Sequence, residues 1–205
     1  MPRVIAGSAG GRPLKVPAGE GTRPTSDRVK EALFSSLGDL TDLVVADLYA
    51  GSGGLGVEAL SRGAARAVFV EQDRRAAAIV QHNLAVAGVA DRGQVVTAPV
   101  ATFCRRPVGG PFDIVLLDPP YRMTVPQIDT DLAALIAAHA LREGAQVVLE
   151  RARHDSEPPI GRLDHRRDRT YGDTLLRYFV FRAAHPPALH PPDDRPPTPQ
   201  GAPPP

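Results

Sequence analysis

The chain has 205 residues, a formal net charge of +1 and a single cysteine, Cys104. This length suffices for one α/β domain with a full core and a modest appendage. One cysteine excludes an internal disulfide framework, and the sequence shows neither a signal-peptide pattern nor a run of 18 apolar residues, so we expect a cytoplasmic protein that has no membrane contact. So small a net charge gives no support of its own to nucleic-acid binding.

The first part of the chain combines a loop-rich segment with a helix. Residues 1–22 are rich in glycine and proline and hold only short apolar pieces, which predicts a small β-hairpin extension outside the core. Thr25 or Ser26 can cap the helix that follows, and Gly38 can end it. The apolar residues of this helix recur at every fourth position: Val29, Leu33 and Leu37.

From residue 43 onward, apolar strands alternate with amphipathic helices. The predicted strands are 44–48, 67–71, 94–97, 113–117 and 145–150, and the predicted helices are 54–62, 74–87, 99–105 and 127–141. This alternation predicts a mostly parallel sheet with helices on both faces. Two further segments, 162–170 and 175–182, flank a Tyr-Gly-Asp-Thr turn. They predict an antiparallel hairpin that completes a seven-stranded sheet.

Three regions follow from this pattern. Residues 1–22 form the hairpin extension and residues 23–183 the α/β domain. Nearly every second residue is proline in the tail, 184–205, and this tail has no apolar periodicity. Such a composition predicts a disordered or polyproline II segment without a chemical role.

A glycine-rich segment follows the strand at 44–48. Gly51 and Gly53 let backbone amides approach a ligand closely. The next strand ends in Glu71, about 20 residues beyond the first glycine, where doubly wound nucleotide sites place the acid that binds ribose hydroxyls. Asp47, inside the first strand, would repel a pyrophosphate. The spacing therefore favours a ligand with a cationic amino group over a dinucleotide.

Asp118-Pro119-Pro120-Tyr121 directly follows the apolar run 114–117. The two prolines fix their φ angles and lack N–H donors, so the carbonyls of this segment can serve as acceptors. Together with the Asp118 carboxylate they can hold both hydrogens of an exocyclic amino group, while Tyr121 stacks on the ring that bears it. A proline-rich turn with a helix-capping aspartate would have the same composition.

These motifs resemble those of the class I S-adenosylmethionine-dependent methyltransferases. Asp47-x-x-x-Gly51-x-Gly53 is similar to their first motif, Glu71 to their ribose acid, and Asp118 to Tyr121 to their amino-methylation motif. The segments Arg3-Val4-Ile5-Ala6-Gly7 and Arg23-Pro24-Thr25-Ser26-Asp27-Arg28-Val29 further resemble the RsmD family. The resemblance implies a Rossmann-like fold, S-adenosylmethionine as cofactor, and methylation of the 2-amino group of a guanine in 16S ribosomal RNA.

The resemblance also extends the set of residues that would bind S-adenosylmethionine, the methyl donor. Tyr49 belongs to this set, and we expect it to pack beneath the glycine loop rather than to act in catalysis. Gln72 directly follows Glu71. Ala98 lies where many class I methyltransferases place a polar or acidic residue against the adenine. Because Ala98 has no polar side chain, adenine recognition must rest on backbone groups or on apolar contact with Val100.

The expected macromolecular partner is small-subunit ribosomal RNA or an assembling 30S subunit, bound by a monomer. Two arginine-rich segments would flank the site and contact phosphates, although solvated surface charge would give the same pattern. The resemblance places residues 23–25 near the substrate, where they would contact RNA or the donor. The RNA-binding candidates are Arg3, Arg12, Lys15, Arg23, Thr25 and Arg166. The histidines and the cysteine have no ligand spacing, so no metal site is predicted.

Other functions stay open at this point. An adenine-amino methyltransferase acting on DNA or RNA, or a protein-glutamine methyltransferase, would use the same clamp, although both more often carry Asn at the position of Asp118. A nicotinamide-dependent oxidoreductase would share the glycine loop but not Asp47 or the clamp. A non-catalytic RNA-binding module would bind RNA without affinity for S-adenosylmethionine.

Overall fold

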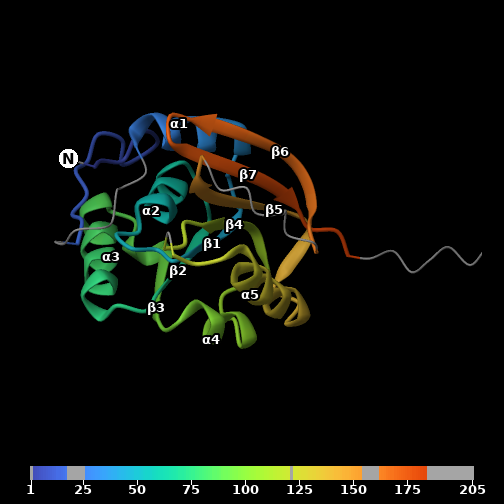
Figure 1. The fold of residues 1–205 in the computed structure, drawn as a ribbon. Helices are drawn as coiled ribbons and strands as arrows, with labels where there is room; N and C mark the ends of the chain where they lie inside the picture. Colours follow the sequence, from blue (N-terminus) through green and yellow to red (C-terminus); the bar gives the residue numbers. More distant parts are fainter. Residues whose placement is uncertain (1, 18–25, 121, 154–161, 184–205) are drawn as a thin grey trace, which may run out of the picture.

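The computed structural model describes residues 2–17, 26–120, 122–153 and 162–183 (Figure 1). The helices are α1 (Asp27–Leu37), α2 (Gly54–Ser61), α3 (Arg74–Ala87), α4 (Val100–Arg105) and α5 (Val125–Ala137), with a 3-10 turn, η1, at Ala90–Arg92. The strands are β1 (Val44–Leu48), β2 (Arg66–Glu71), β3 (Gly93–Thr97), β4 (Phe112–Leu117), β5 (Leu141–Ala152), β6 (Asp164–Tyr171) and β7 (Thr174–Val180).

The seven strands form one sheet in the order β3-β2-β1-β4-β5-β7-β6. Strands β1 to β5 are parallel, whereas β7 runs antiparallel to both β5 and β6. The predicted mostly parallel sheet with a C-terminal hairpin is therefore confirmed. The strand order reverses between β1 and β4, and in open sheets of this kind ligands bind outside the carboxyl ends of the strands at such a point.

Helices cover both faces of the sheet (Figure 1). Strand β4 shows why its sequence is a continuous apolar run: Ile114 and Leu116 belong to the core shared with α1, α2 and α3, whereas Val115 and Leu117 belong to the core under α4 and α5. A strand that is buried on both faces needs no polar alternation. This sandwich holds the carboxyl ends of β1 and β4 rigidly.

Local signals set most helix ends where the sequence predicts them. The Ser26 hydroxyl accepts the Val29 N–H at the start of α1, and Gly38, with φ of 82°, ends this helix. Asp73 caps α3 through the N–H groups of residues 75 and 76, and Gly88 ends it in the left-handed conformation. Side-chain caps and left-handed glycines satisfy backbone groups that a helix end leaves without partners.

The C-terminal end of α5 differs from the prediction. The helix ends at Ala137 and not at residue 141, and β5 begins at Leu141, well before the predicted residue 145. His139 therefore follows the helix, with a positive φ of 53°, and does not lie on it. The reason lies in the tertiary structure. Leu141 pairs with Phe112 of β4 and is buried in the core, so it is apolar as a strand residue although it also fits the apolar pattern of the preceding helix.

Residues 2–17 fold back in a hairpin-like manner, with one antiparallel bridge between Arg3 and Pro13 and backbone hydrogen bonds that join residues 2–4 to residues 11–14. Val4 and Leu14 are buried in the core with α1, α2 and α3, so the expectation that this segment lies outside the core is wrong. We call residues 2–17 the N-terminal segment. The tail, 184–205, lies outside the described residues.

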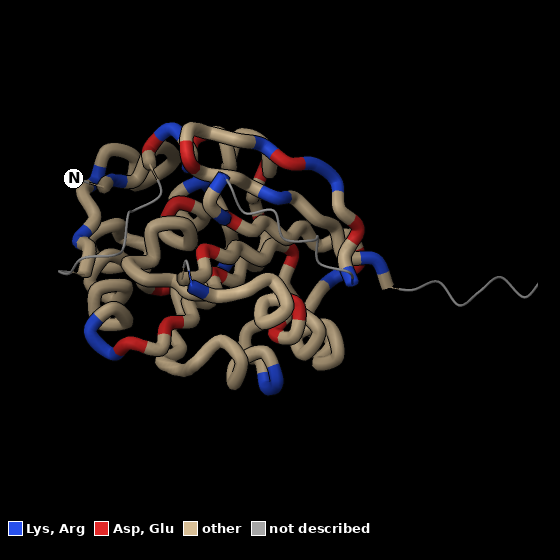
Figure 2. Tube along the Cα trace, viewed as in Figure 1, with Lys and Arg blue, Asp and Glu red and all other residues tan. Residues whose placement is uncertain are grey.

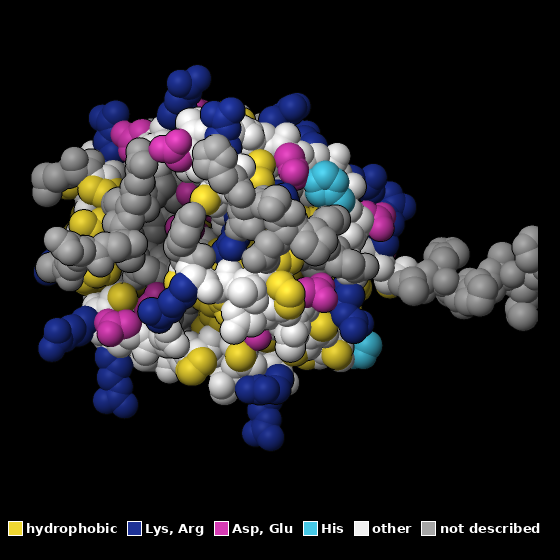
Figure 3. Space-filling view, in the orientation of Figure 1, with side chains coloured by type: hydrophobic (Ala, Val, Ile, Leu, Met, Phe, Trp, Pro, Cys, Tyr) yellow, Lys and Arg dark blue, Asp and Glu magenta, His cyan; other side chains and the backbone are white. Residues whose placement is uncertain are grey.

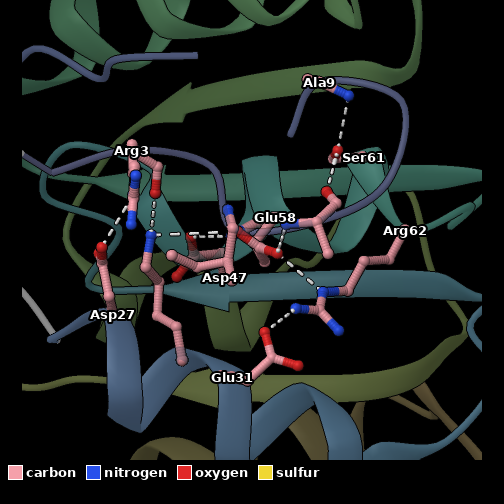
Figure 4. Close-up of polar contacts among 12 residues, drawn as sticks. Arg3, Ala9, Asp27, Glu31, Asp47, Glu58, Ser61 and Arg62 are labelled. Atoms are coloured by element: carbon pink, nitrogen blue, oxygen red, sulfur yellow. Dashed lines mark hydrogen bonds and ion pairs between the residues drawn. The ribbon is translucent and has the colours of Figure 1, made fainter. Parts of the chain in front are cut away.

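Helix α2 holds the N-terminal segment through a buried carboxylate (Figure 4). Glu58 is fully buried and accepts the N–H groups of Ile5 at 2.7 Å and Ala6 at 3.0 Å. The same carboxylate pairs with Arg62 at 2.7 Å and with buried Lys30 at 3.9 Å. A buried charge is tolerated only when it is paired and hydrogen-bonded, as Glu58 is. The N-terminal segment is thus an integral part of the domain.

Candidate active site

The loops that follow β1 and β4 lie at the same edge of the sheet. The register pairs Leu48 with Leu117, so the residues around Asp47 and those after Leu117 are neighbours. Acidic positions occur at the centre of the molecule, whereas Lys and Arg positions lie mainly toward its outline (Figure 2). The predicted donor loop and the predicted amino clamp therefore meet at the topological switch point.

The glycine loop between β1 and α2 is held by Glu71. One carboxylate oxygen of Glu71 accepts the Gly51 N–H at 2.8 Å, and the other accepts the Asp73 N–H at 2.8 Å. Each carboxylate oxygen has a further lone pair. Glu71, at the end of β2, can therefore keep the loop in place and still accept hydrogen bonds from the hydroxyls of a ligand.

One glycine of this loop and one in the first turn of α2 are required by geometry. Gly53 precedes α2 in the left-handed conformation with φ of 77°, and a Cβ on it would lie 2.9 Å from the Val80 side chain. A Cβ on Gly56 would lie 2.3 Å from the ring of Phe69 on β2. Close helix–strand packing is the role of the third glycine in dinucleotide fingerprints. It brings the first turn of α2, with its N–H groups, against the carboxyl end of the sheet.

Asp47 is buried inside β1 and accepts the N–H of Gly56, in the first turn of α2, at 2.8 Å. Burial raises the pKa of this carboxyl to about 7; the Gly56 hydrogen bond opposes the rise, and the nearby Glu71 charge adds to it. Asp47 thus anchors the start of α2 from the strand beneath it. The binding of a cationic ligand by Asp47 stays a prediction. Near neutral pH the Asp47 carboxyl is close to its pKa, so a bound cation would readily shift it to the ionised form.

Tyr49 is partly buried and packs against the core under α4 and α5. Its backbone adopts a positive φ of 63°, which is strained for a side chain of this size. The hydroxyl donates to an Asp131 carboxylate oxygen of α5 at 2.9 Å. Burial, followed by the charge of Asp131, raises the pKa of the hydroxyl, so Tyr49 remains a donor. This hydrogen bond joins the residue just before the glycine loop to α5, the helix that follows the predicted amino clamp.

Asp118 and the two prolines form the first part of the predicted clamp at the end of β4. Pro119 is buried, and the Pro120 carbonyl accepts the Met123 N–H at 2.8 Å, which closes a turn. Of the two proline carbonyls, that of Pro119 is therefore the better candidate acceptor for a substrate. Tyr121, the predicted stacking residue, lies outside the described residues.

The Asp118 carboxyl is flanked by other acids. Burial raises its pKa well above the usual value, and the charges of Glu150 and Asp47 raise it further. Glu150 ends the apolar part of β5, one residue after the pair formed by Leu117 and Leu149. A ligand cation close to this group would lower the pKa of Asp118 and favour its ionised form. The site is thus built for positive charge.

The sequence prediction missed Glu150, although a signal was present. The apolar run 145–149 ends in an acid just as the strand before Glu71 does, and parallel strands bring their carboxyl ends to one edge. Asp131 on α5 and Asn83 on α3 were missed as well. Each is a buried polar residue on the apolar face of its helix, an exception that marks a specific hydrogen-bonding role.

The residues proposed for adenine recognition are less well placed. The N–H of Ala98 donates to the Glu71 carbonyl at 3.1 Å, so this backbone donor is already used. Val100 begins α4 and is almost fully buried in the core, whereas Gln72 is exposed after β2. Apolar contact of the adenine with the Val100 side chain stays a prediction, and so does any contact of the cofactor with Gln72.

Two of the RNA-binding candidates in the N-terminal segment already have partners within the protein. The Arg3 guanidinium pairs with Asp27 at 3.0 Å, and Arg12 donates to the Val86 carbonyl. Lys15 is exposed. Arg23 and Thr25 lie outside the described residues, so the structure does not place them. Exposed pairs of this kind are weak, and RNA phosphates can compete for both arginines.

Arg166 is exposed on the edge strand β6, at a register irregularity between residues 165 and 167. Its neighbour Arg167 lies over the ring of Tyr178 and donates to the Ser36 carbonyl near the end of α1. The two basic segments therefore contact opposite ends of α1. Figure 3 shows Lys and Arg side chains spread around the outline of this face and not gathered in one patch.

Other kinds of site find no support in the described residues. These residues contain no group of three His, Cys, Asp or Glu side chains able to hold a metal ion. Cys104 is buried, which raises its thiol pKa to about 12 and makes it a poor nucleophile. A cavity of about 210 Å³ is lined by Arg66 and Gln94, near the amino ends of β2 and β3 and away from the clamp. Every described helix is too short or too polar to span a lipid bilayer.

Comparisons with known proteins agree with this architecture. A family model described as conserved hypothetical protein 95 matches residues 2–180. YlbH of Bacillus subtilis, for which an rRNA methyltransferase activity is proposed, is 38% identical over 186 residues, which cover 88% of this chain and 99% of YlbH. Ribosomal RNA small subunit methyltransferase D of Escherichia coli K12 is 44% identical over 121 residues, which cover 58% of this chain and 60% of that protein.

A solved structure matches over almost its whole length. The structure of yhhF from Escherichia coli, for which a methyltransferase activity is proposed, superposes with a TM-score of 0.76 at 34% identity. The match covers 88% of this chain and 98% of yhhF. The matched family region begins at residue 2 and so includes the N-terminal segment, in agreement with the buried contacts of that segment.

Proposed function

The chain belongs to the RsmD family, and on this premise we propose that it methylates the exocyclic 2-amino group of a guanine in small-subunit ribosomal RNA. Relatives that match this chain are named as ribosomal RNA methyltransferases, and a structural neighbour from Salinibacter ruber is in complex with S-adenosyl-L-homocysteine, which supports methylation of ribosomal RNA with S-adenosylmethionine. The choice of the guanine 2-amino group is the finer part of the proposal. It rests on Asp118 and Pro119, at the strand end beside the glycine loop.

The residues around the glycine loop fit this cofactor. S-adenosylmethionine supplies a methyl group that its sulfonium has already activated, so the protein needs no nucleophile of its own. Glu71 would accept hydrogen bonds from the ribose hydroxyls of S-adenosylmethionine, and the buried carboxylate of Asp47 would attract the cationic amino group at the amino acid end of the same molecule. Asp47, Asp118 and Glu150 come from the adjacent strands β1, β4 and β5, and this acidic setting suits a cationic donor.

Asp118 carries the chemistry in this proposal. The 2-amino nitrogen of guanine is a poor nucleophile because its lone pair is delocalised into the ring. The Asp118 carboxylate and the Pro119 carbonyl would accept its two hydrogens and favour a pyramidal nitrogen whose lone pair points at the methyl group. Positive charge develops on this nitrogen during transfer, and the carboxylate stabilises it most in the transition state. The released proton passes to Asp118 or to water.

The substrate must reach this site as an unstacked base. Tyr121 would replace the stacking that the guanine loses when it leaves its neighbours. Arg3, Lys15 and Arg166 would contact phosphates of the RNA. Adenine and glutamine methyltransferases more often carry Asn where this chain has Asp118, which favours guanine over these alternatives. A cytoplasmic location and a monomeric state stay predictions.

Single-turnover methyl transfer to small-subunit RNA or 30S subunits tests the proposal. At saturating donor, Asp118→Ala should lose about 100-fold or more in the rate of methyl transfer, the usual cost of removing a group that stabilises transition-state charge. Asp118→Asn should lose less, because an amide oxygen still accepts one hydrogen. Mass spectrometry of the digested RNA should identify 2-N-methylguanine. A wild-type rate in Asp118→Ala, or a methyl group on adenine, would refute the proposal.

A further inference from the structure

Asn83 is a fully buried amide on the apolar face of α3. The neighbouring positions on this face, Val80, Leu84 and Ala87, belong to the core that α3 shares with α1 and α2. An amide in such surroundings is costly unless its donors and acceptor are satisfied. Asn83 satisfies them with groups from two distant parts of the chain.

One part is the N-terminal segment and the other is the glycine loop. The Asn83 side-chain oxygen accepts the Lys15 N–H at 2.9 Å, and its nitrogen donates to the Lys15 carbonyl at 2.9 Å. The second hydrogen of the same nitrogen goes to the Ser52 carbonyl at 2.8 Å. Ser52 lies between Gly51 and Gly53. The amide thus has both amino hydrogens and its oxygen engaged.

The pair of hydrogen bonds to the Lys15 backbone decides how the Asn83 amide is oriented. Because the backbone of Lys15 offers one donor and one acceptor, only one orientation of the amide matches both, and that orientation leaves a hydrogen for the Ser52 carbonyl. Elsewhere in the loop, Gly51 N–H is held by Glu71 and Gly53 N–H by the Ala50 carbonyl. Asn83 supplies the side-chain hydrogen bond at the residue between these two glycines.

We propose that Asn83 is a positioning residue that fixes the glycine loop in its donor-binding shape and makes the N-terminal segment a structural part of the donor site. This inference rests on the proposed function insofar as the loop binds S-adenosylmethionine. A loop that is held in its bound shape loses less conformational entropy when the ligand binds, so its affinity is higher. Loss of the Asn83 amide should therefore appear in donor affinity and not only in stability.

Ser61 on α2 offers a matched control. It is also a buried polar side chain that holds the N-terminal segment, since its hydroxyl accepts the Ala9 N–H at 2.9 Å and donates to the Ala6 carbonyl at 2.6 Å (Figure 4). None of its hydrogen bonds reaches the glycine loop. Ser61→Ala therefore removes anchoring of the N-terminal segment, whereas Asn83→Ala removes such anchoring together with the bond to Ser52.

Calorimetric titration with S-adenosylhomocysteine, the demethylated product of the donor, separates the two effects without RNA. Asn83→Ala should weaken affinity about tenfold, and Ser61→Ala should change it by less than about twofold, although urea denaturation should show both proteins destabilised. Asn83→Asp keeps the acceptor for Lys15 N–H but loses both donated hydrogens, so it should weaken affinity at least as much. Asn83→Ser covers the case in which Asn83→Ala does not fold, and it should also weaken binding.

Two results would overturn the inference. Unchanged affinity in the folded Asn83 variants would leave Asn83 with a purely structural role, and an equal loss in Ser61→Ala would trace the effect to general loosening. In turnover assays the KM for the donor should rise while kcat at saturating donor stays within about twofold, since Asn83 touches no reacting group. If no RNA is methylated by the wild-type protein, the proposed function fails, yet the titrations still decide the role of Asn83.

Discussion

The affinity for S-adenosylhomocysteine should rise with pH between pH 6 and pH 8, and Asp47 should cause the rise. Burial, opposed by the Gly56 hydrogen bond and reinforced by the Glu71 charge, raises the pKa of Asp47 to about 7. Only the ionised carboxylate attracts a cationic amino group. As the pH rises through this pKa, the ionised fraction grows and binding strengthens, whereas an ordinary aspartate would already be ionised throughout this range.

The size of the effect follows from the pKa. A group with a pKa of about 7 is ionised to about one-tenth at pH 6 and to about nine-tenths at pH 8, so affinity should increase about ninefold, or about 1.3 kcal/mol. The bound cation lowers the pKa of Asp47 in the complex, and protons should therefore be released on binding below pH 7. Calorimetry in buffers of different ionisation enthalpy measures this proton release directly.

Asp47→Asn is the matched variant for this measurement. Its amide oxygen can still accept the Gly56 N–H, but the side chain has no charge to gain. Its affinity should lie below that of the wild type at pH 8, and its pH dependence should be clearly weaker than that of the wild type once the titrations of the ligand and of Asp118, common to both proteins, are taken into account. An equal pH dependence in the two proteins, or equal affinity at pH 8, would contradict the assigned role of Asp47.

Most of the fold can be predicted from the sequence because its signals are local. Helix α3 shows this well: Asp73 and Gly88 mark its two ends, and the structure places the helix between them. The inner strands β1, β2 and β4 are buried on both faces and therefore stand out as apolar runs, such as 114–117. Alternation of such strands with helices then restricts the topology.

The N-terminal segment could not be placed in this way, because its partners are far away in sequence. Ile5 and Ala6 bond to Glu58, more than 50 residues further along, and Lys15 bonds to Asn83 at a separation of 68 residues. No local pattern reports such contacts. Glycine and proline in this segment indicate turns, but they do not show that Val4 and Leu14 fill the core.

The residues of the candidate active site likewise fall into those that local sequence signals identify and those that only the tertiary structure shows. Asp47, Glu71 and Asp118 could be identified because parallel strands bring their carboxyl ends to one edge, and acids at those ends stand out in sequence. Asn83 and Asp131 support the site from within helices. A polar residue on an apolar helix face shows that a buried partner exists, but only the tertiary structure shows which one.

Two further substitutions test the hydrogen-bonding roles of buried carboxylates. Glu71→Ala should weaken S-adenosylhomocysteine binding by about 1 to 3 kcal/mol, and Glu71→Gln by less, because Gln keeps one acceptor oxygen; calorimetry showing no change in Glu71→Ala would contradict the ribose role. Glu58→Gln leaves buried Lys30 without its counter-charge and weakens the bond to Arg62, so the free energy of unfolding should fall by about 3 to 5 kcal/mol. Glu31→Gln removes only the exposed partner of Arg62 and should cost less than about 1 kcal/mol. Equal urea midpoints for these two variants would show that the buried charge of Glu58 adds no more stability than the exposed charge of Glu31.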